Sequence, residues 1–282
     1  MRRVFYVLLA IALLVMIPRA AFAQTPSCDA LTGEKKTLTT AIMASQHPYD
    51  CCDGTIQQCL TRKPVCQLAV HLANHVCRLA ALGKDRATIE RSLAQRATSM
   101  TGARSVPIDL SRAERAGDPA AKVTVVAYLC ARCPYCSRLL PALHRSATEG
   151  ELKGKVRLYF REFPIRSHAG STEGSLAMVA ARHLGKGWPY LLHLYRIFDK
   201  FDGTKLVDYA VEDGLDAARF RALMAEPGVR RELVASKKEG VRNKVSATPT
   251  VFINGRPYGS DLDIEVLKTV LLEEHERVTR KK

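Results

Sequence analysis

The chain has 282 residues, of which 47% are apolar and 25% are charged, and its formal net charge is +15. This is an ordinary globular composition with no low-complexity tract, and the length allows one large domain or two of ordinary size. The basic residues occur in short clusters without interleaved aromatic residues, which argues against a nucleic-acid-binding surface. We therefore predict a solvated basic surface and no nucleic-acid partner.

The first 23 residues have the pattern of a secretory signal peptide. Two arginines precede an apolar run from Val4 to Ile17, and a triplet typical of a cleavage site ends at Ala23. An uncleaved anchor is the alternative, but the apolar run is shorter than the roughly 20 residues that a spanning helix needs. We expect cleavage before Gln24, export, and no stable membrane span in the mature protein.

All nine cysteines lie after this segment. In an oxidising compartment thiols tend to pair, whereas in a cytosol the same pattern would suggest a metal site. Three cysteines form a central cluster, and six crowd the N-terminal third, where we expect structural disulfides with a pairing that the sequence leaves open. The six are Cys28, Cys51, Cys52, Cys59, Cys66 and Cys77.

Residues 24–100 are predicted to form a small Cys-rich helical hairpin. One helix runs from Pro64 to Leu82, beginning at a proline and ending before a glycine, and a second runs from Asp85 to Thr98. A hairpin of this size buries little apolar surface alone, so disulfides would supply the missing stability.

Cys66 and Cys77 lie on the same predicted helix and cannot pair with each other. Their spacing corresponds to about 16 Å along the axis, whereas the Cα atoms of a disulfide lie within about 7 Å. We expect both to reach the preceding loop, where Cys51, Cys52 and Cys59 are the natural partners.

His71 and His75 on this helix have the i, i+4 spacing of a metal-binding pair. They fall on the face opposite the cysteines, beside other polar residues. We therefore interpret them as part of a solvated polar face.

The remaining chain is predicted to be a linker at 101–121, with one short strand from Ser105 to Leu110, followed by an α/β domain at 122–282. In that domain, strand and helix patterns first alternate, and a long run of helices then precedes the last strand. The expected strands cover 122–129, 155–163 and 248–256, and the expected helices cover 134–148, 171–184, 188–201, 203–212, 216–224, 227–241 and 262–277.

The redox chemistry is predicted at Cys133-Pro134-Tyr135-Cys136, between the first strand of this domain and its first helix. A thiol at the first turn of a helix lies near unpaired backbone N–H groups and the positive end of the helix dipole. Both stabilise the thiolate, which is the reactive form. Pro134 suits the first helical position, where its missing N–H costs nothing.

This motif, the helical insertion and the late segment Ala247-Thr248-Pro249-Thr250-Val251-Phe252-Ile253-Asn254-Gly255 together resemble the disulfide oxidoreductase A (DsbA-like) family of the thioredoxin superfamily. These are exported proteins that handle disulfides in the bacterial periplasm. The resemblance implies an α/β thioredoxin-like fold with a long helical insertion, preceded here by a small disulfide-stapled α-helical domain.

The resemblance also implies the site and the partners. Cys133 would be the nucleophile and Cys136 the resolving thiol, with Pro134 and Tyr135 tuning the potential. Thr248 and Pro249 would form a cis-proline turn that binds the substrate backbone. It implies no cofactor, unfolded or partly oxidised polypeptides as substrates, a membrane redox partner that recycles the dithiol, and a periplasmic location.

Two features depart from the family pattern. Cys130 creates a third thiol at the same spacing, and we consider three interpretations: a buried thiol at the strand end, a third redox thiol, or an iron–sulfur or zinc ligand. The first strand carries no buried acid, and Glu162 is the nearest candidate for proton transfer.

The N-terminal hairpin leaves an alternative function open. Cys66, the turn after Leu82 and the second helix are faintly similar to the small helical thiol domain used in cytochrome c maturation. On this alternative the protein is a thiol reductase or a haem- or metal-handling factor, with the N-terminal cysteines as relay or ligands. The direction of electron flow is not predicted.

Overall fold

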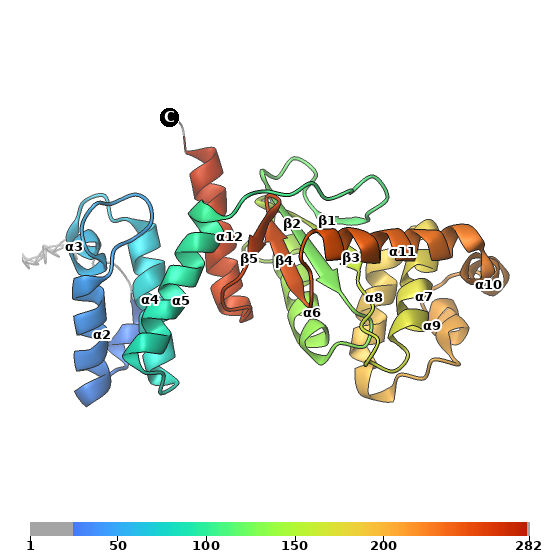
Figure 1. Ribbon diagram of the computed structural model, residues 1–282, viewed down its shortest axis with the longest axis horizontal. Helices are drawn as coiled ribbons and strands as arrows, with labels where there is room; N and C mark the ends of the chain where they lie inside the picture. The colour runs from blue at the N-terminus through green and yellow to red at the C-terminus, as the bar shows by residue number, and fades with distance from the viewer. Residues whose placement is uncertain (1–24, 281–282) are drawn as a thin grey trace, which may run out of the picture.

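The computed structural model describes residues 25 to 280, so the expected signal segment lies outside the described residues. A disulfide-bonded helical unit comes first and an α/β unit follows, and the last helix, α12 (Ile264–Thr279), stands between them (Figure 1). Within the described part of the chain, no helix is both long and apolar enough to cross a membrane.

The N-terminal unit is built on α4, whose apolar face contacts the other helices of the unit. Leu72, Val76 and Cys77 on this face are almost completely buried, and Ile42 and Ile56 pack against them from two other helices. The unit comprises α1 (Pro26–Asp29), α2 (Gly33–Ser45), α3 (Ile56–Thr61), α4 (Gln67–Ala81), α5 (Arg86–Ala97) and the π-helical turn η1 (Thr98–Gly102).

Three disulfides cross-link this unit: Cys28–Cys77, Cys51–Cys66 and Cys52–Cys59. Cys66 therefore pairs with the loop, as expected. The expectation for Cys77 is wrong, because α1 packs along α4 and brings Cys28 to within 5.0 Å of Cys77, measured between the Cα atoms. Of the remaining cysteines, Cys51 pairs with Cys66, and Cys52 pairs with Cys59.

The interpretation of His71 and His75 as a solvated face is also wrong. His75 is 3% exposed and contacts the Ser92 hydroxyl at 2.8 Å, and burial lowers its pKa to about 3. His71 Nδ1 lies 3.0 Å from the Glu273 carboxylate on α12. The polar face of α4 is thus covered by α5 and α12 rather than by solvent.

One carboxylate on α12 joins the two units. Glu273 forms an ion pair with Arg96, which is completely buried, and accepts a hydrogen bond of 2.6 Å from the Tyr49 hydroxyl. Burial alone would raise the pKa of Glu273, but Arg96 and His71 outweigh it and the pKa is lowered. The carboxylate is therefore charged, and its charge is compensated entirely by side chains of the N-terminal unit.

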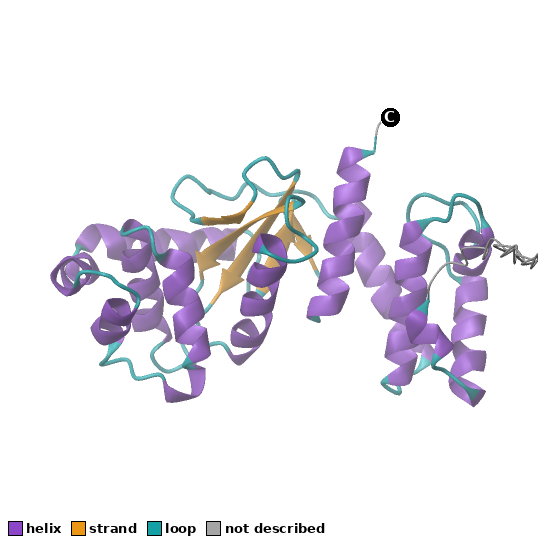
Figure 2. Cartoon of the chain, turned by 180° about the vertical axis from the view of Figure 1, so that it is seen from behind, coloured by secondary structure: helices purple, strands orange, loops and turns teal. Residues whose placement is uncertain are grey.

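The α/β unit contains a five-stranded sheet of order β1-β3-β2-β4-β5, visible in Figure 2. Only β2 and β3 are parallel, and the remaining pairs are antiparallel. The central strand β2 is rich in β-branched residues and buried on both faces, as is usual for a parallel pair covered by helices. The strands are β1 (Arg115–Gly117), β2 (Val123–Leu129), β3 (Val156–Glu162), β4 (Thr250–Ile253) and β5 (Arg256–Tyr258).

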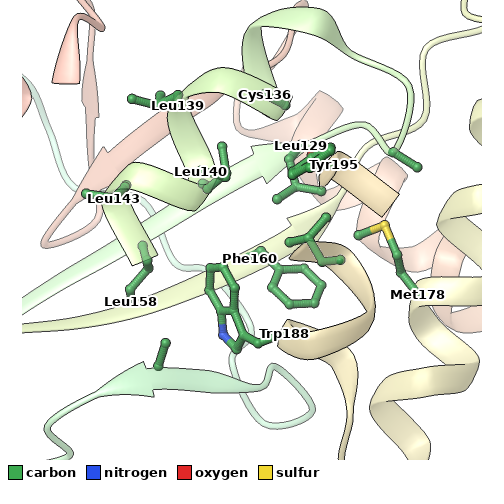
Figure 3. Close-up of a cluster of buried hydrophobic side chains, with 14 of the residues drawn as sticks. Leu129, Cys136, Leu139, Leu140, Leu143, Leu158, Phe160, Met178, Trp188 and Tyr195 are labelled. Carbon is green, nitrogen blue, oxygen red and sulfur yellow. The ribbon is translucent and has the colours of Figure 1, made fainter. Parts of the chain in front are cut away.

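The main core lies between one face of the sheet and the helices α6, α8 and α12. Leu129 on β2 and Phe160 on β3 face Leu140 on α6 and Trp188 on α8, as Figure 3 shows. Cys136 belongs to the same cluster. The redox motif is therefore attached directly to the packed interior.

The segment from Ser105 to Leu110 is not the strand that we expected. Its alternate apolar residues, Val106, Ile108 and Leu110, cover the second face of the sheet over Tyr128 and Phe252. The alternation reflects one buried side of an extended segment, which needs no ladder of hydrogen bonds. The first strand of the unit is instead β1.

The expected architecture is confirmed: an α/β unit with a helical insertion follows the disulfide-bonded helices. The insertion packs as a group at the end of the sheet remote from the N-terminal unit (Figure 1). The helices outside the N-terminal unit, α12 aside, are α6 (Pro134–Thr148), α7 (Ser171–His183), α8 (Gly187–Arg196), η2 (Phe198–Lys200), α9 (Leu206–Glu212), α10 (Ala217–Ala225) and α11 (Pro227–Arg242).

Candidate active site

The motif lies where β2 ends and α6 begins. Cys133 is the N-cap residue of α6, with an extended backbone, and Pro134 occupies the first helical position. The amide of Cys136 points at the Cys133 sulfur over 3.5 Å. A sulfur at this position replaces the oxygen of an ordinary N-cap side chain, so it accepts an amide that the helix itself leaves unpaired.

The thiol of Cys133 is poised to ionise. A hydrogen bond from the side chain of Cys136 is the main cause, and the Thr248 side chain and the first amides of α6 add to it. Burial opposes these effects, since the residue is only 1% exposed. The net result lowers the pKa of Cys133 from 9.0 to about 5, so at neutral pH the group is a thiolate.

Cys136 behaves in the opposite way. It is completely buried, and burial together with the neighbouring Cys133 sulfur raises its pKa far above the ordinary value. Two thiols three residues apart therefore differ in protonation: Cys133 ionises readily although it is buried, and Cys136 is a protonated thiol that donates to it. This asymmetry separates a nucleophile from a resolving group.

The turn before β4 faces these thiols. The Thr248–Pro249 peptide bond is cis, and the Cys133 thiol donates to the Thr248 carbonyl oxygen over 3.1 Å. The buried Thr248 hydroxyl has no other partner within residues 25–280 and contributes to the lowered pKa of Cys133. When Cys133 is ionised the Thr248 carbonyl loses this donor and can accept from another chain.

A groove of about 570 Å³ runs beside the motif. Its apolar lining includes Pro249, Leu139 and the start of α12. Tyr135 is 67% exposed at its edge, and the Arg138 guanidinium lies 5.5 Å from the Tyr135 ring centre. A groove with apolar walls and charged edges suits an extended polypeptide.

The N-terminal unit reaches the edge of this groove, a contact that could not be predicted from the sequence. Arg78 on α4 forms ion pairs with Asp261 and Asp263, and both of these aspartates line the groove. Tyr195 on α8 is a second residue that was missed, and its hydroxyl donates to the Cys130 carbonyl over 3.1 Å. Both contacts join segments far apart in the chain and have no local pattern.

The side chain of Cys130 has different partners from that of Cys133. The residue is completely buried, burial raises its pKa, and its sulfur lies 3.4 Å from His168 Nδ1. Its partners thus differ from those of Cys133, which favours the interpretation as a buried thiol at the strand end. Among residues 25–280, no cluster of three or more His, Cys, Asp or Glu side chains could hold a metal ion.

Two charged neighbours face elsewhere. The Arg132 guanidinium stacks over the rings of Phe198 and Phe201 and donates to the Phe198 carbonyl, so it does not point at the Cys133 thiolate. Glu162 is buried, and its carboxylate lies 3.4 Å from Arg182. The carboxylate considered for proton transfer is therefore engaged in a structural ion pair.

Residues 112 to 273 match the family model described as Thioredoxin. Over 186 residues the chain is 30% identical to the Na(+)/H(+) antiporter NhaA 3 of Salinispora tropica, an alignment that covers 64% of this chain and 28% of the antiporter. It is 28% identical to the Na(+)/H(+) antiporter NhaA of Herminiimonas arsenicoxydans over 62% of this chain and 27% of that protein. The chain thus spans less than a third of the length of either relative.

Solved structures with similar folds include a thioredoxin-like oxidoreductase from Silicibacter pomeroyi, with a TM-score of 0.50, 24% identity, and coverage of 64% of this chain and 97% of that one. BdbD from Bacillus subtilis has a TM-score of 0.51 and 18% identity, with coverage of 62% and 98%. The thiol-disulfide exchange protein α-DsbA2 from Wolbachia pipientis has a TM-score of 0.52 and 17% identity, with coverage of 66% and 95%. The family model covers the unit that carries the Cys133 motif, and this chain belongs to the thioredoxin family.

Proposed function

We propose that the protein is an exported thiol-disulfide oxidoreductase that exchanges disulfides with polypeptides through Cys133 and Cys136. The observation that carries the proposal is the Cys133 thiol at the start of α6, which accepts from the amide of Cys136 and lies 3.1 Å from the carbonyl oxygen of Thr248 in the turn before β4. An electron-rich sulfur, a backbone acceptor and an apolar groove lie side by side. This is what a transient covalent complex with an extended chain requires.

Exchange at this site proceeds through a mixed disulfide. A substrate thiolate attacks the Cys133 sulfur of the oxidised protein, the Cys133–Cys136 bond breaks, and Cys136 leaves and takes up a proton because its thiolate is strongly disfavoured. The second substrate thiol then attacks its own sulfur in the mixed disulfide and expels Cys133 as a thiolate. Two electrons pass from the substrate to the Cys133–Cys136 pair.

The low pKa of Cys133 favours oxidation of the substrate as the direction. A thiolate that is stabilised in the folded protein makes the reduced form more stable, and hence the disulfide form a stronger oxidant. It also makes Cys133 a good leaving group in the last step. The reduced protein must then be recycled, and a membrane redox partner bound at the same groove would serve this purpose.

The role of each thiol can be tested by trapping. A Cys136→Ala variant incubated with oxidised substrate polypeptides should accumulate mixed disulfides on Cys133, visible as thiol-sensitive adducts on non-reducing gels. A Cys133→Ser, Cys136→Ala variant should form none, and a Cys130→Ser variant is the matched control that should retain turnover. Turnover is measured as oxidation of a reduced, unfolded protein or as reduction of insulin. Full turnover by a Cys133→Ser variant in either assay would rule out the proposal.

The periplasmic location has its own test. It rests on the segment before Gln24, and it predicts a mature chain that begins at Gln24 and fractionates with periplasmic contents. A cell-associated protein that retains residues 1–23 would contradict it, without affecting the redox assignment.

The alternative of haem or metal handling gains no supporting contact. The six N-terminal cysteines are paired in three disulfides, so they could serve as ligands only after reduction. The thiol chemistry of this unit is therefore better considered as disulfide chemistry.

A further inference from the structure

We propose that the Cys51–Cys66 disulfide is a second thiol-exchange site, which accepts electrons from cysteine-containing polypeptides or small thiols independently of Cys133. It lies in the N-terminal unit, beside the C-terminal half of α12. The other two disulfides of that unit are structural.

Accessibility distinguishes this disulfide from the others. Cys51 is exposed and Cys66 is 8% exposed, and both line a cavity of about 370 Å³ between the N-terminal unit and α12, as does Cys52. The other bridges each have a completely buried sulfur-bearing residue, Cys59 in one and Cys77 in the other. Thiol exchange requires a nucleophile to approach one sulfur in line with the bond, and the exposed Cys51 offers such an approach.

The position of Cys66 favours it as the leaving group. Cys66 is the N-cap residue of α4, which has 15 residues, just as Cys133 is the N-cap residue of α6, which also has 15. The side chain of Cys66 makes no capping hydrogen bond while its sulfur is in the disulfide. Once released, a Cys66 thiolate would lie at the first, unpaired amides of α4, and a stabilised thiolate leaves faster.

The remaining cysteines of the unit lack this arrangement. Cys77 lies in the interior of α4, Cys28 within α1, Cys59 within the short helix α3, and Cys52 in the loop before α3. None of these is the N-cap residue of a helix. Attack at those bridges would therefore expel a thiolate without comparable stabilisation.

The backbone at Cys51 also favours opening of the bond. Cys51 has a φ of 64°, which places it in the left-handed region that disfavours residues with a β-carbon. It is held there by the bridge and by a hydrogen bond of 2.7 Å from its amide to the Asp50 carboxylate. Cleavage of the bridge removes one of these two constraints.

The cavity supplies a surface for a peptide around the disulfide. Pro64, Val65 and Leu68 provide an apolar wall. Charged side chains of both signs form the rest of the lining: Asp50, Arg62, Glu273, Glu276, Arg277 and Arg280. With a volume of about 370 Å³, the cavity is large enough for a cysteine side chain and its neighbours rather than for a solvent molecule alone.

The two redox centres are separated along α12. The cavity is lined by Glu273 and Arg277, whereas the groove at Pro249 is lined by Ile264. Glu273 and Arg277 lie about 14 and 20 Å from Ile264 along the axis, at 1.5 Å per helical residue. The Cys51–Cys66 bridge and the groove at Pro249 thus lie at opposite ends of α12, and a separate molecule is the reaction partner we infer for Cys51–Cys66.

The reaction is balanced by a dithiol substrate. Its first thiolate attacks the Cys51 sulfur, the bond to Cys66 breaks, and Cys66 leaves as a thiolate. The second thiol of the substrate then attacks the mixed disulfide and displaces Cys51. The substrate loses two electrons and two protons to become a disulfide, and Cys51 and Cys66 become thiols.

The test uses the full chain with Cys133→Ser and Cys136→Ser, which removes the first centre. The protein is incubated with reduced glutathione, quenched with an alkylating reagent at early times, and analysed by peptide mass spectrometry. Cys51–Cys66 should open about tenfold faster than Cys52–Cys59, the internal control in the same loop, with the first glutathione adduct on Cys51. Equal rates, earlier opening of Cys52–Cys59, or simultaneous loss of all three bridges would overturn the proposal.

A second measurement separates exchange from unfolding. A reduced, unfolded dithiol polypeptide is offered to the same variant, and the electrons taken up are counted from the thiols that appear. Two thiols per chain should appear at Cys51 and Cys66, and the additional substitutions Cys51→Ser and Cys66→Ser should abolish uptake. Uptake that persists in that variant would assign the exchange elsewhere. Because Cys133 is absent throughout, the result does not depend on the function proposed above.

Discussion

Replacing Cys133 by serine should destabilise the reduced protein by an amount that depends on pH. Lowering the pKa from 9.0 to about 5 corresponds to a stabilisation of the ionised folded form by about 5 kcal/mol. A lowered pKa contributes stability that is complete above the unfolded pKa and is lost as pH falls through the folded pKa. The contribution of Cys133 to the free energy of unfolding should therefore decline from pH 9 down to about pH 5, and about 3 kcal/mol of it should remain at pH 7.

The assay is urea unfolding at several pH values of the protein in which Cys133 and Cys136 are thiols, and of the Cys133→Ser variant. The three N-terminal disulfides stay intact in both proteins. The difference in unfolding free energy should be small at pH 4, about 3 kcal/mol at pH 7 and about 5 kcal/mol above pH 9. A Cys130→Ser variant is the control. Burial raises the pKa of that thiol, so its effect should not vary between pH 4 and pH 8. A difference that is constant with pH, or that grows on acidification, would refute the reasoning.

Three further substitutions test contacts around the site. Glu273→Gln removes the charge from a carboxylate buried against Arg96 and should lower the free energy of unfolding by about 3 kcal/mol. The control is Glu276→Gln on the exposed side of the same helix, which should lower it by less than about 0.5 kcal/mol. Equal effects of the two substitutions would argue against the buried ion pair. Arg78→Ala removes the ion-pair partner of Asp261 at the edge of the groove. KM for polypeptide substrates should rise by less than about fivefold and kcat should stay unchanged. A changed kcat would contradict this expectation. Cys130→Ala should lower stability by about 1 kcal/mol and leave turnover intact, and lost turnover would instead identify a third redox thiol.

The redox motif could be predicted because its determinants are local. An apolar β-branched strand, a cysteine at the helix start and a proline at the next position specify the N-cap geometry of Cys133 within a few residues. The lowered pKa follows from the same short stretch, together with Thr248. The cis bond at Pro249 needed the family resemblance, since nothing in its neighbourhood distinguishes it from a trans bond.

The expectations that were wrong concern contacts between distant segments. The polar face of α4 looked solvated because the residue that covers His71 lies 202 positions later in the chain. Cys77 was assigned to the nearest cysteines in sequence, while α1 brought Cys28 closer. The alternation of Val106 and Ile108 was interpreted as a strand, although it reports only that one side of the segment is buried. The spacing of apolar residues indicates which side of a segment is buried, but it does not identify the segment that packs against that side.

The carboxylate of Glu273 gives the protein an order of assembly. All three N-terminal disulfides close between residues 28 and 77, so they can form while the rest of the chain is still being synthesised. Arg96, by contrast, has its carboxylate partner on the last helix, and it stays in water until α12 emerges. Docking of the two units therefore cannot precede the synthesis of α12, and a chain that stops short of α12 should present its cross-linked helices as a separate body with Arg96 exposed.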